Sequence, residues 1–168
     1  MTRAQLPALG YAYVALALPA LLVGSDHTRL ASALFTGAAF AYLWFIASLR
    51  AKLVRFDPDG FFASVVVLGG AGFLTLQAIA LLASATEAAA PSSACAATVI
   101  VGSSLAAQRA RKIPRWFGQA GTAGGIAVLA VGVLEGATDW TLAGEALFAS
   151  SLGFMVWVLV TATYLLRR

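Results

Sequence analysis

The chain alternates between long apolar runs and short polar segments. There are six such runs, and they are nearly free of charged residues. Each is about as long as the helix of roughly 20 residues that crosses the ~30 Å hydrocarbon core of a bilayer. The runs show no apolar–polar alternation of the kind a strand requires, so helices are predicted. The predicted fold is an all-α membrane bundle, a single domain over residues 1–168. Its predicted spans are Leu6–Gly24, Leu30–Leu49, Phe61–Ala83, Ala88–Gln108, Pro114–Leu134 and Leu142–Leu166.

The segments between the runs contain turn-forming residues. Asp57-Pro58-Asp59-Gly60 predicts a turn before the third span. Pro114 suits the first turn of the fifth span, where a missing N–H has no partner to lose. These residues mark where the third and fifth spans begin.

The fourth run is the weakest by hydropathy, because Pro91 and several serines interrupt it. The distribution of charge supports it as a span. With six spans, ten of the eleven Lys and Arg residues fall on one side and only Arg29 falls on the other. Short loops rich in Lys and Arg stay in the cytoplasm, so both termini are predicted to be cytoplasmic. The ten are Arg3, Arg50, Lys52, Arg55, Arg109, Arg111, Lys112, Arg115, Arg167 and Arg168.

The first run has a second interpretation. Arg3, the apolar stretch after it and Val23-Gly24-Ser25 together resemble a cleavable signal peptide. In that case five spans would remain.

The composition agrees with a membrane protein and limits the chemistry. The chain is 61% hydrophobic and 11% charged, whereas soluble domains carry about 25% charged residues. A soluble enzyme, a disordered chain and a disulfide scaffold are excluded. His27 and Cys95 are the only residues of their kinds, so no catalytic, metal or cofactor site is predicted and the chain is not expected to be an enzyme. Its expected partner is the lipid bilayer of the cell (inner or plasma) membrane, and no nucleic acid is expected.

The fifth span carries glycines near one face of a helix. Such small residues let two backbones approach closely in lipid. The favoured interpretation is packing inside the same bundle; the alternative is a homodimer or a membrane-protein partner bound through the fifth span. The glycines are Gly118, Gly121, Gly125, Gly132 and Gly136.

Polar residues inside two spans give a second candidate site. Gln77 is the deepest strong hydrogen-bonding side chain, with Thr75 near it and Ser103 and Ser104 in the fourth span. One hypothesis is that the four line a small polar cavity. The other is that each forms an ordinary hydrogen bond to a neighbouring helix.

Three motifs between Ala39 and Leu134 carry a resemblance to a known family. They are Leu43-Trp44-Phe45 leading into Leu49-Arg50-Ala51-Lys52-Leu53, then Gly69-Gly70, then Ile113-Pro114-Arg115-Trp116-Phe117-Gly118. With them the chain resembles an uncharacterised family of small, Ala/Leu-rich, multi-span bacterial membrane proteins of actinobacterial type. The resemblance implies a multi-span bundle and brings no activity, cofactor or site residue.

These observations favour a structural, accessory or interaction subunit in the membrane. The alternative is a small transporter or permease-like protein with a polar cavity near Gln77.

Overall fold

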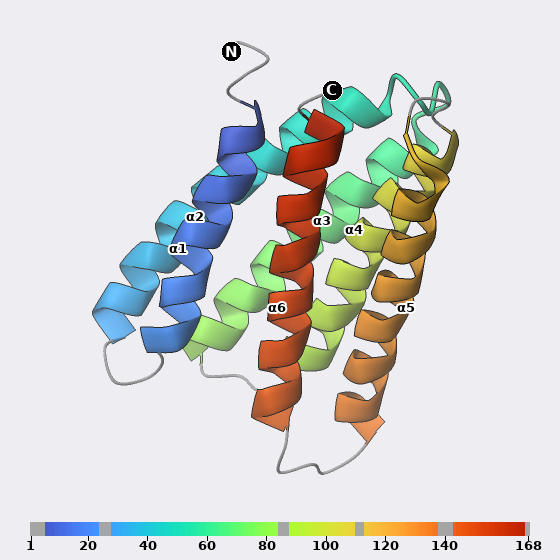
Figure 1. Ribbon diagram of the computed structural model, residues 1–168. Helices are drawn as coiled ribbons and strands as arrows, with labels where there is room; N and C mark the ends of the chain where they lie inside the picture. Colours follow the sequence, from blue (N-terminus) through green and yellow to red (C-terminus); the bar gives the residue numbers. More distant parts are fainter. Residues whose placement is uncertain (1–5, 24–27, 84–87, 110–112, 138–142, 167–168) are drawn as a thin grey trace.

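The computed structural model describes residues 6–23, 28–83, 88–109, 113–137 and 143–166, and this part of the chain is helical with no strand (Figure 1). The predicted all-α fold is therefore confirmed. The helices are α1 (Leu6–Val23), α2 (Thr28–Leu53), α3 (Phe61–Ala83), α4 (Ala89–Arg109), α5 (Arg115–Ala137) and α6 (Ala143–Thr161), and α6 continues into a π-helical turn, Ala162–Leu166.

Helix α2 differs most from its predicted run. The apolar run ends at Leu49, but the helix continues to Leu53 and includes Arg50 and Lys52 in its last turn. Both residues are good helix formers, and cations are favourable at a helix C-terminus. Hydropathy thus located the apolar part of this helix and missed its polar end.

Four of the six helices are long and apolar enough to cross a membrane. The qualifying stretches are Arg29–Leu53, Phe61–Ala80, Ala90–Arg109 and Arg115–Leu134. Helices α1 and α6 contain shorter apolar stretches, Pro7–Val23 and Phe148–Tyr164.

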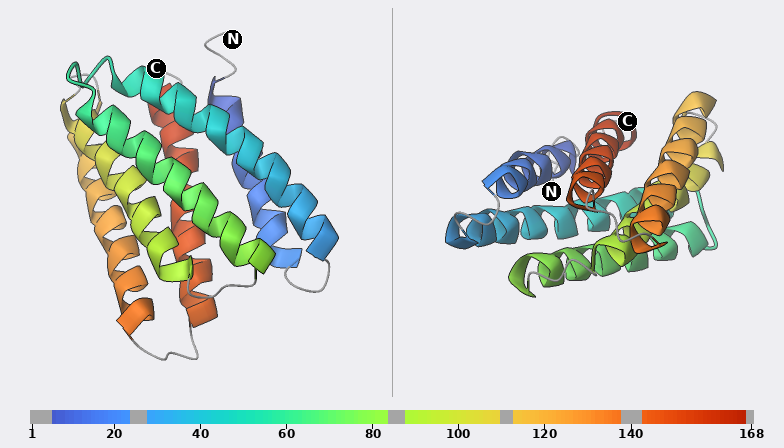
Figure 2. Two further views of the ribbon diagram at one scale, coloured as in Figure 1. Left: turned by 180° about the vertical axis from the view of Figure 1, so that it is seen from behind. Right: turned by 90° about the horizontal axis from the view of Figure 1, so that it is seen from below.

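Successive helices run in alternating directions, so α1 begins and α6 ends at the same end of the bundle (Figure 1). Each of α1 to α5 packs against the next helix in the chain, and α6 packs against α1, α4 and α5. Seen end-on, α1, α6 and α5 lie along one side and α2 and α3 along the other (Figure 2). Helix α4 lies between α3 and α5 and is the most buried of the four long apolar helices, with 61% of its apolar window covered.

The interior is built around aromatic rings. Tyr42, Phe45 and Phe154 are fully buried. Phe154 of α6 packs against Phe73 of α3 with 4.5 Å between ring centroids, and against Tyr42 of α2 at 5.9 Å. Tilted and edge-on ring pairs add directional attraction to van der Waals contact. These rings fix α6 against α2 and α3.

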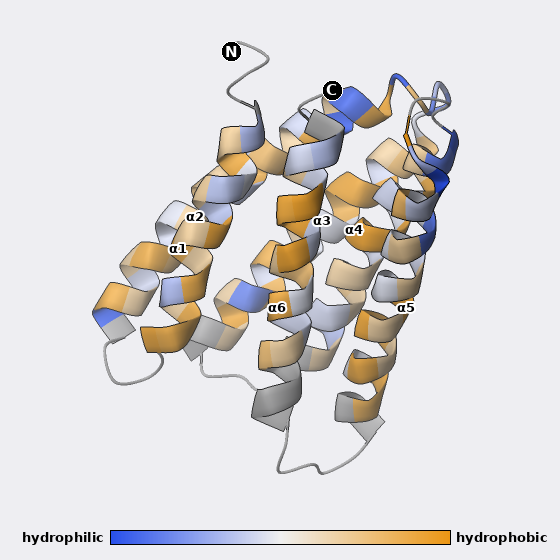
Figure 3. Ribbon diagram, viewed as in Figure 1, coloured by the Kyte–Doolittle hydropathy of each residue, from blue (hydrophilic) through white to orange (hydrophobic). Residues whose placement is uncertain are grey.

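The outer surface of the bundle is apolar. Leu68 is 73% exposed, Leu22 66% and Phe40 65%, and hydrophobic residues occur along every helix (Figure 3). A helix on the surface of a soluble protein turns its polar face outward instead. The exposed apolar surface suits a lipid environment.

Candidate functional site

The glycine face of α5 lies directly on α4. A Cβ added at Gly125 would lie 2.6 Å from Val101 Cγ2 and 3.3 Å from the carbonyl oxygen of Ala97. One added at Gly132 would lie 2.6 Å from Ser93 Cβ. Contacts this short leave no room for a side chain, so these glycines let the two backbones approach closely.

The upper part of the same seam is equally tight. A Cβ at Gly118 would overlap the side chain of Gln108, and one at Gly121 would overlap Ser104 Oγ. Four of the five predicted packing glycines thus face α4 of the same chain. The surroundings of Gly136 lie outside the described residues. A partner bound through this face would have to displace α4.

The four polar residues predicted to share a cavity lie in different surroundings. Gln77 Nε2 donates a hydrogen bond to Ser92 Oγ of α4 at 3.0 Å. Thr75 is exposed, and its hydroxyl donates to the carbonyl oxygen of Ala71 at 2.9 Å. Ser103 is buried and donates to the carbonyl oxygen of Val99 at 2.8 Å.

Their depths along α4 also differ. Ser103 is eleven positions beyond Ser92 in the helix, which is a rise of about 16 Å. Gln77 therefore does not meet Ser103 and Ser104. It lines a cavity of about 50 Å³ together with Tyr13, Phe73 and Ser151, which is several-fold smaller than ordinary ligand sites. This cavity has room for a few water molecules.

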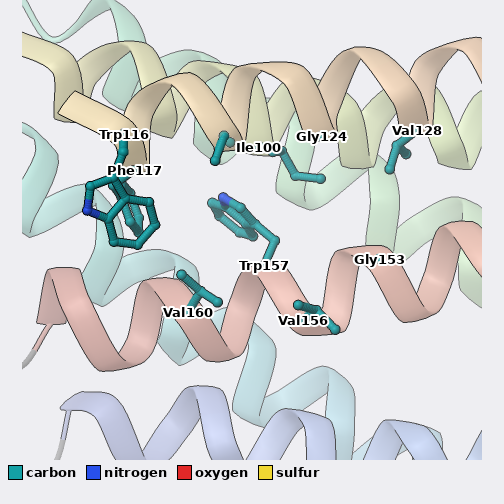
Figure 4. Close-up of a pocket in the computed structure, with 11 residues that line it drawn as sticks. Ile100, Trp116, Phe117, Gly124, Val128, Gly153, Val156, Trp157 and Val160 are labelled. Atoms are coloured by element: carbon teal, nitrogen blue, oxygen red, sulfur yellow. The ribbon is translucent and has the colours of Figure 1, made fainter. Parts of the chain in front are cut away.

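A larger cavity of about 280 Å³ lies between α5 and α6 (Figure 4); we call it the α5–α6 groove. Gly124 and Val128 line it from α5, and Gly153 and Val160 line it from α6. Among the described atoms, nothing lies within 4 Å of a Cβ added at Gly124. Its lining residues are apolar throughout.

Aromatic residues close the groove at one end and form its inner wall. Trp116 is half exposed at the rim and meets Tyr164 edge-on, with 5.6 Å between centroids. Trp157 is 7% exposed, stacks on Phe154 and meets Phe45 edge-on. Its nitrogen lies on the side of the ring that faces α5 (Figure 4).

Two buried polar atoms lie beside Gly121 at this inner wall. Trp157 Nε1 is 3.9 Å from the position of a Cβ on Gly121, and Ser104 Oγ lies closer still. Within the described part of the chain neither atom has a hydrogen-bond partner. A buried donor without an acceptor costs about 1–3 kcal/mol. Both atoms are covered by the side chains around them and do not reach the open space of the groove.

The basic end of the bundle holds an ion pair. The side chain of Asp57 is fully buried, and its Oδ1 lies 3.3 Å from Nη1 of Arg109, the last residue of α4. Asp57 Oδ2 accepts a hydrogen bond of 2.6 Å from the backbone N–H of Phe62, in the first turn of α3. The Arg109 guanidinium lies over the Phe62 ring, 4.6 Å from its centroid. Asp57 thus joins the start of α3 to the end of α4.

The turn that presents Asp57 is the predicted one. The N–H of Gly60 donates to the carbonyl oxygen of Asp57 at 2.9 Å, and Gly60 has a φ of 69°, which few residues other than glycine adopt. The sequence indicated the turn but not the pairing with Arg109. The two residues are 52 positions apart, and no local signal links them. Nor did the sequence indicate the α5–α6 groove, because its lining comes from α5, α6 and Ile100 of α4.

Among the described residues, no three His, Cys, Asp or Glu side chains lie close enough to hold a metal ion. No protein-family model, curated protein or solved structure matches the chain.

Proposed function

We propose that the chain is an integral protein of a bacterial cytoplasmic membrane, with six spans and both termini on the cytoplasmic side. The alternating helix directions support this arrangement. So do the described cations: five lie at the end where α1 begins, and Arg29 lies at the other (Figure 3). Helix α1 has 18 residues and rises about 27 Å, close to the thickness of the hydrocarbon core.

Cysteine labelling tests this topology. In a Cys95→Ala background, a cysteine placed at Lys112 should react with a membrane-impermeant maleimide only after the cells are opened. A cysteine at Arg29 should react in intact cells. Labelling of position 112 from outside intact cells would contradict the proposal.

Within the membrane, we propose an accessory role that consists of binding an apolar molecule in the α5–α6 groove rather than of catalysis. The observation that carries this proposal is the open space at Gly124 between two helices that are otherwise packed into the bundle. A transport role through a polar cavity is less favoured, because the Gln77 side chain is already hydrogen-bonded to Ser92.

The volume of the groove indicates what it can hold. A helix is about 10 Å wide with its side chains, too wide to enter this groove of about 280 Å³ with its backbone. The groove therefore suits a hydrocarbon chain or a flat ring better than a helix of a partner protein.

Filling the groove tests the proposal. Gly124→Leu should occupy the open space without disturbing the bundle, and Ala123→Leu, at an exposed position outside the groove, is the matched control. The probe is 1-bromododecane, whose bromine quenches tryptophan fluorescence on contact. We expect the probe to quench the wild type and Ala123→Leu equally and Gly124→Leu much less, because Trp116 and Trp157 line the groove.

Equal quenching of all three proteins would overturn the binding proposal. A change of oligomeric state in mild detergent on Gly124→Leu, without a change in quenching, would also overturn it and would assign the groove to a second copy of the chain.

A further inference from the structure

A second apolar groove runs over α4, between α3 and α5. Its volume is about 380 Å³, and we call it the α4 groove. Val101 and Leu105 form part of its floor, Phe61 and Phe62 line it from α3, and Leu129 lines it from α5. It shares no lining residue with the α5–α6 groove, so the two are separate features.

The α4 groove is about as long as one leaflet of a bilayer is thick, and it runs along the axis of α4. Its lining on α4 extends from Ala94 to Leu105, eleven positions that rise about 16 Å. Half of a hydrocarbon core of roughly 30 Å is about 15 Å. Leu105 and Phe62 lie toward the basic end, so the groove begins near that end and reaches about the middle of the membrane.

A cation lies at the start of the groove. Phe62 lines the groove, and the Arg109 guanidinium lies over its ring. Arg109 is 55% exposed although its guanidinium is held by Asp57. A guanidinium has five N–H donors in a planar fork that suits phosphate, and Asp57 occupies only one of its nitrogens.

The surrounding charge is also positive. Among the described residues at this end, five cations stand against two carboxylates, Asp57 and Asp59. Anionic lipid headgroups are attracted to such a surface at roughly 1 kcal/mol per Lys or Arg. The α4 groove thus combines an apolar channel of one-leaflet length with a fixed cation at the depth of the headgroups.

We propose that the α4 groove binds one acyl chain of an anionic glycerophospholipid from the cytoplasmic leaflet, with its phosphate on Arg109. The inference rests on the proposed membrane location and is independent of the occupant of the α5–α6 groove. It assigns Arg109 two roles: the guanidinium closes the α3–α4 junction through Asp57 and presents its remaining donors to the lipid.

Native mass spectrometry of the full chain in mild detergent tests the proposal, with dioleoyl phosphatidylglycerol and dioleoyl phosphatidylcholine as probes. The two lipids share their chains and differ in net charge. We expect about fivefold stronger retention of phosphatidylglycerol, as one well-placed cation would give. Glycerophosphoglycerol, which has the headgroup without the chains, should not compete.

The decisive variant removes the cation without leaving a buried charge unpaired. Asp57→Asn with Arg109→Gln keeps an oxygen for the Phe62 N–H and should abolish the preference for phosphatidylglycerol. Arg50→Gln, which removes an exposed cation at the end of α2, is the matched control and should keep it. A preference that survives the double variant, or falls equally in Arg50→Gln, would overturn the proposal.

A second variant leaves the charges in place. Leu105→Trp narrows the groove and should reduce retention of both lipids. Unchanged retention would overturn the proposal whether or not the double variant folds. Failure of these lipid tests would leave the labelling result for the topology intact, so the two proposals can fail separately.

Discussion

Helix α5 has small residues on two faces, and the two faces meet their neighbours differently. On one, Gly121 lies against Ser104 of α4, and Gly125 lies against Val101 and the backbone of Ala97. On the other, Gly124 faces open space next to α6. The difference lies in the opposite helix. Helix α4 meets these glycines with Ser104, Val101 and the backbone of Ala97, whereas α6 meets the groove with the large ring of Trp157, which keeps the two helices apart. A glycine permits close approach, and the facing residue decides whether it occurs.

Gly121→Leu is expected to lower the free energy of unfolding more than any other substitution on these two faces. The new side chain would overlap Ser104 and force α5 away from α4. Overpacking of this kind costs about 3 kcal/mol or more when backbones cannot shift cheaply. Gly124→Leu, three positions along the same helix, should change the free energy of unfolding by less than about 0.5 kcal/mol, because it enters open space.

Unfolding in mixed micelles with increasing dodecyl sulfate, followed by circular dichroism, measures both free energies. Similar losses for the two variants would mean that the two faces of α5 are packed alike.

A smaller effect tests the contact at Gly121 itself. Gly121→Ala adds a Cβ that overlaps Ser104 Oγ, and Ser104→Ala removes that oxygen. Ser104→Ala alone should change stability little, because the hydroxyl has no hydrogen-bond partner among the described residues. In the double variant the cost of Gly121→Ala should fall by about 1 kcal/mol, a coupling typical of residues in contact. The same unfolding assay measures the wild type, the two single variants and the double variant. Strictly additive changes in the free energy of unfolding would argue against the contact.

The sequence was sufficient for the helices and insufficient for their contacts. Apolar run length located all six helices, because a helix in lipid must be long and uncharged. The low hydropathy of the fourth run has a structural explanation. Ser92, Ser93, Ser103 and Ser104 are buried on α4 against its neighbours, so the residues that weaken the prediction are those that allow close packing.

Less of the candidate sites than of the helices could be predicted from the sequence. The glycine spacing identified a packing face but not the helix it packs on. Gln77 was recognised as a deep polar residue, yet its partner Ser92 was not, because a hydrogen bond between two helices leaves no periodic signal in either. The ion pair between Asp57 and Arg109 was missed for the same reason. Asp57 precedes α3 and Arg109 ends α4, so nothing local in the sequence links them.

The burial of α4 bears on how the chain enters the bilayer. This helix is the least hydrophobic of the four long candidates, because its serines and alanines serve contact with protein rather than with lipid. Such a segment partitions poorly by itself, since insertion depends on the apolar character of each span. Helix α5 follows after a short connection, and its glycines lie against Ser93 and Ser104 of α4. We therefore expect the two to leave the translocation machinery as a pair, with α5 shielding α4 from the acyl chains during biogenesis.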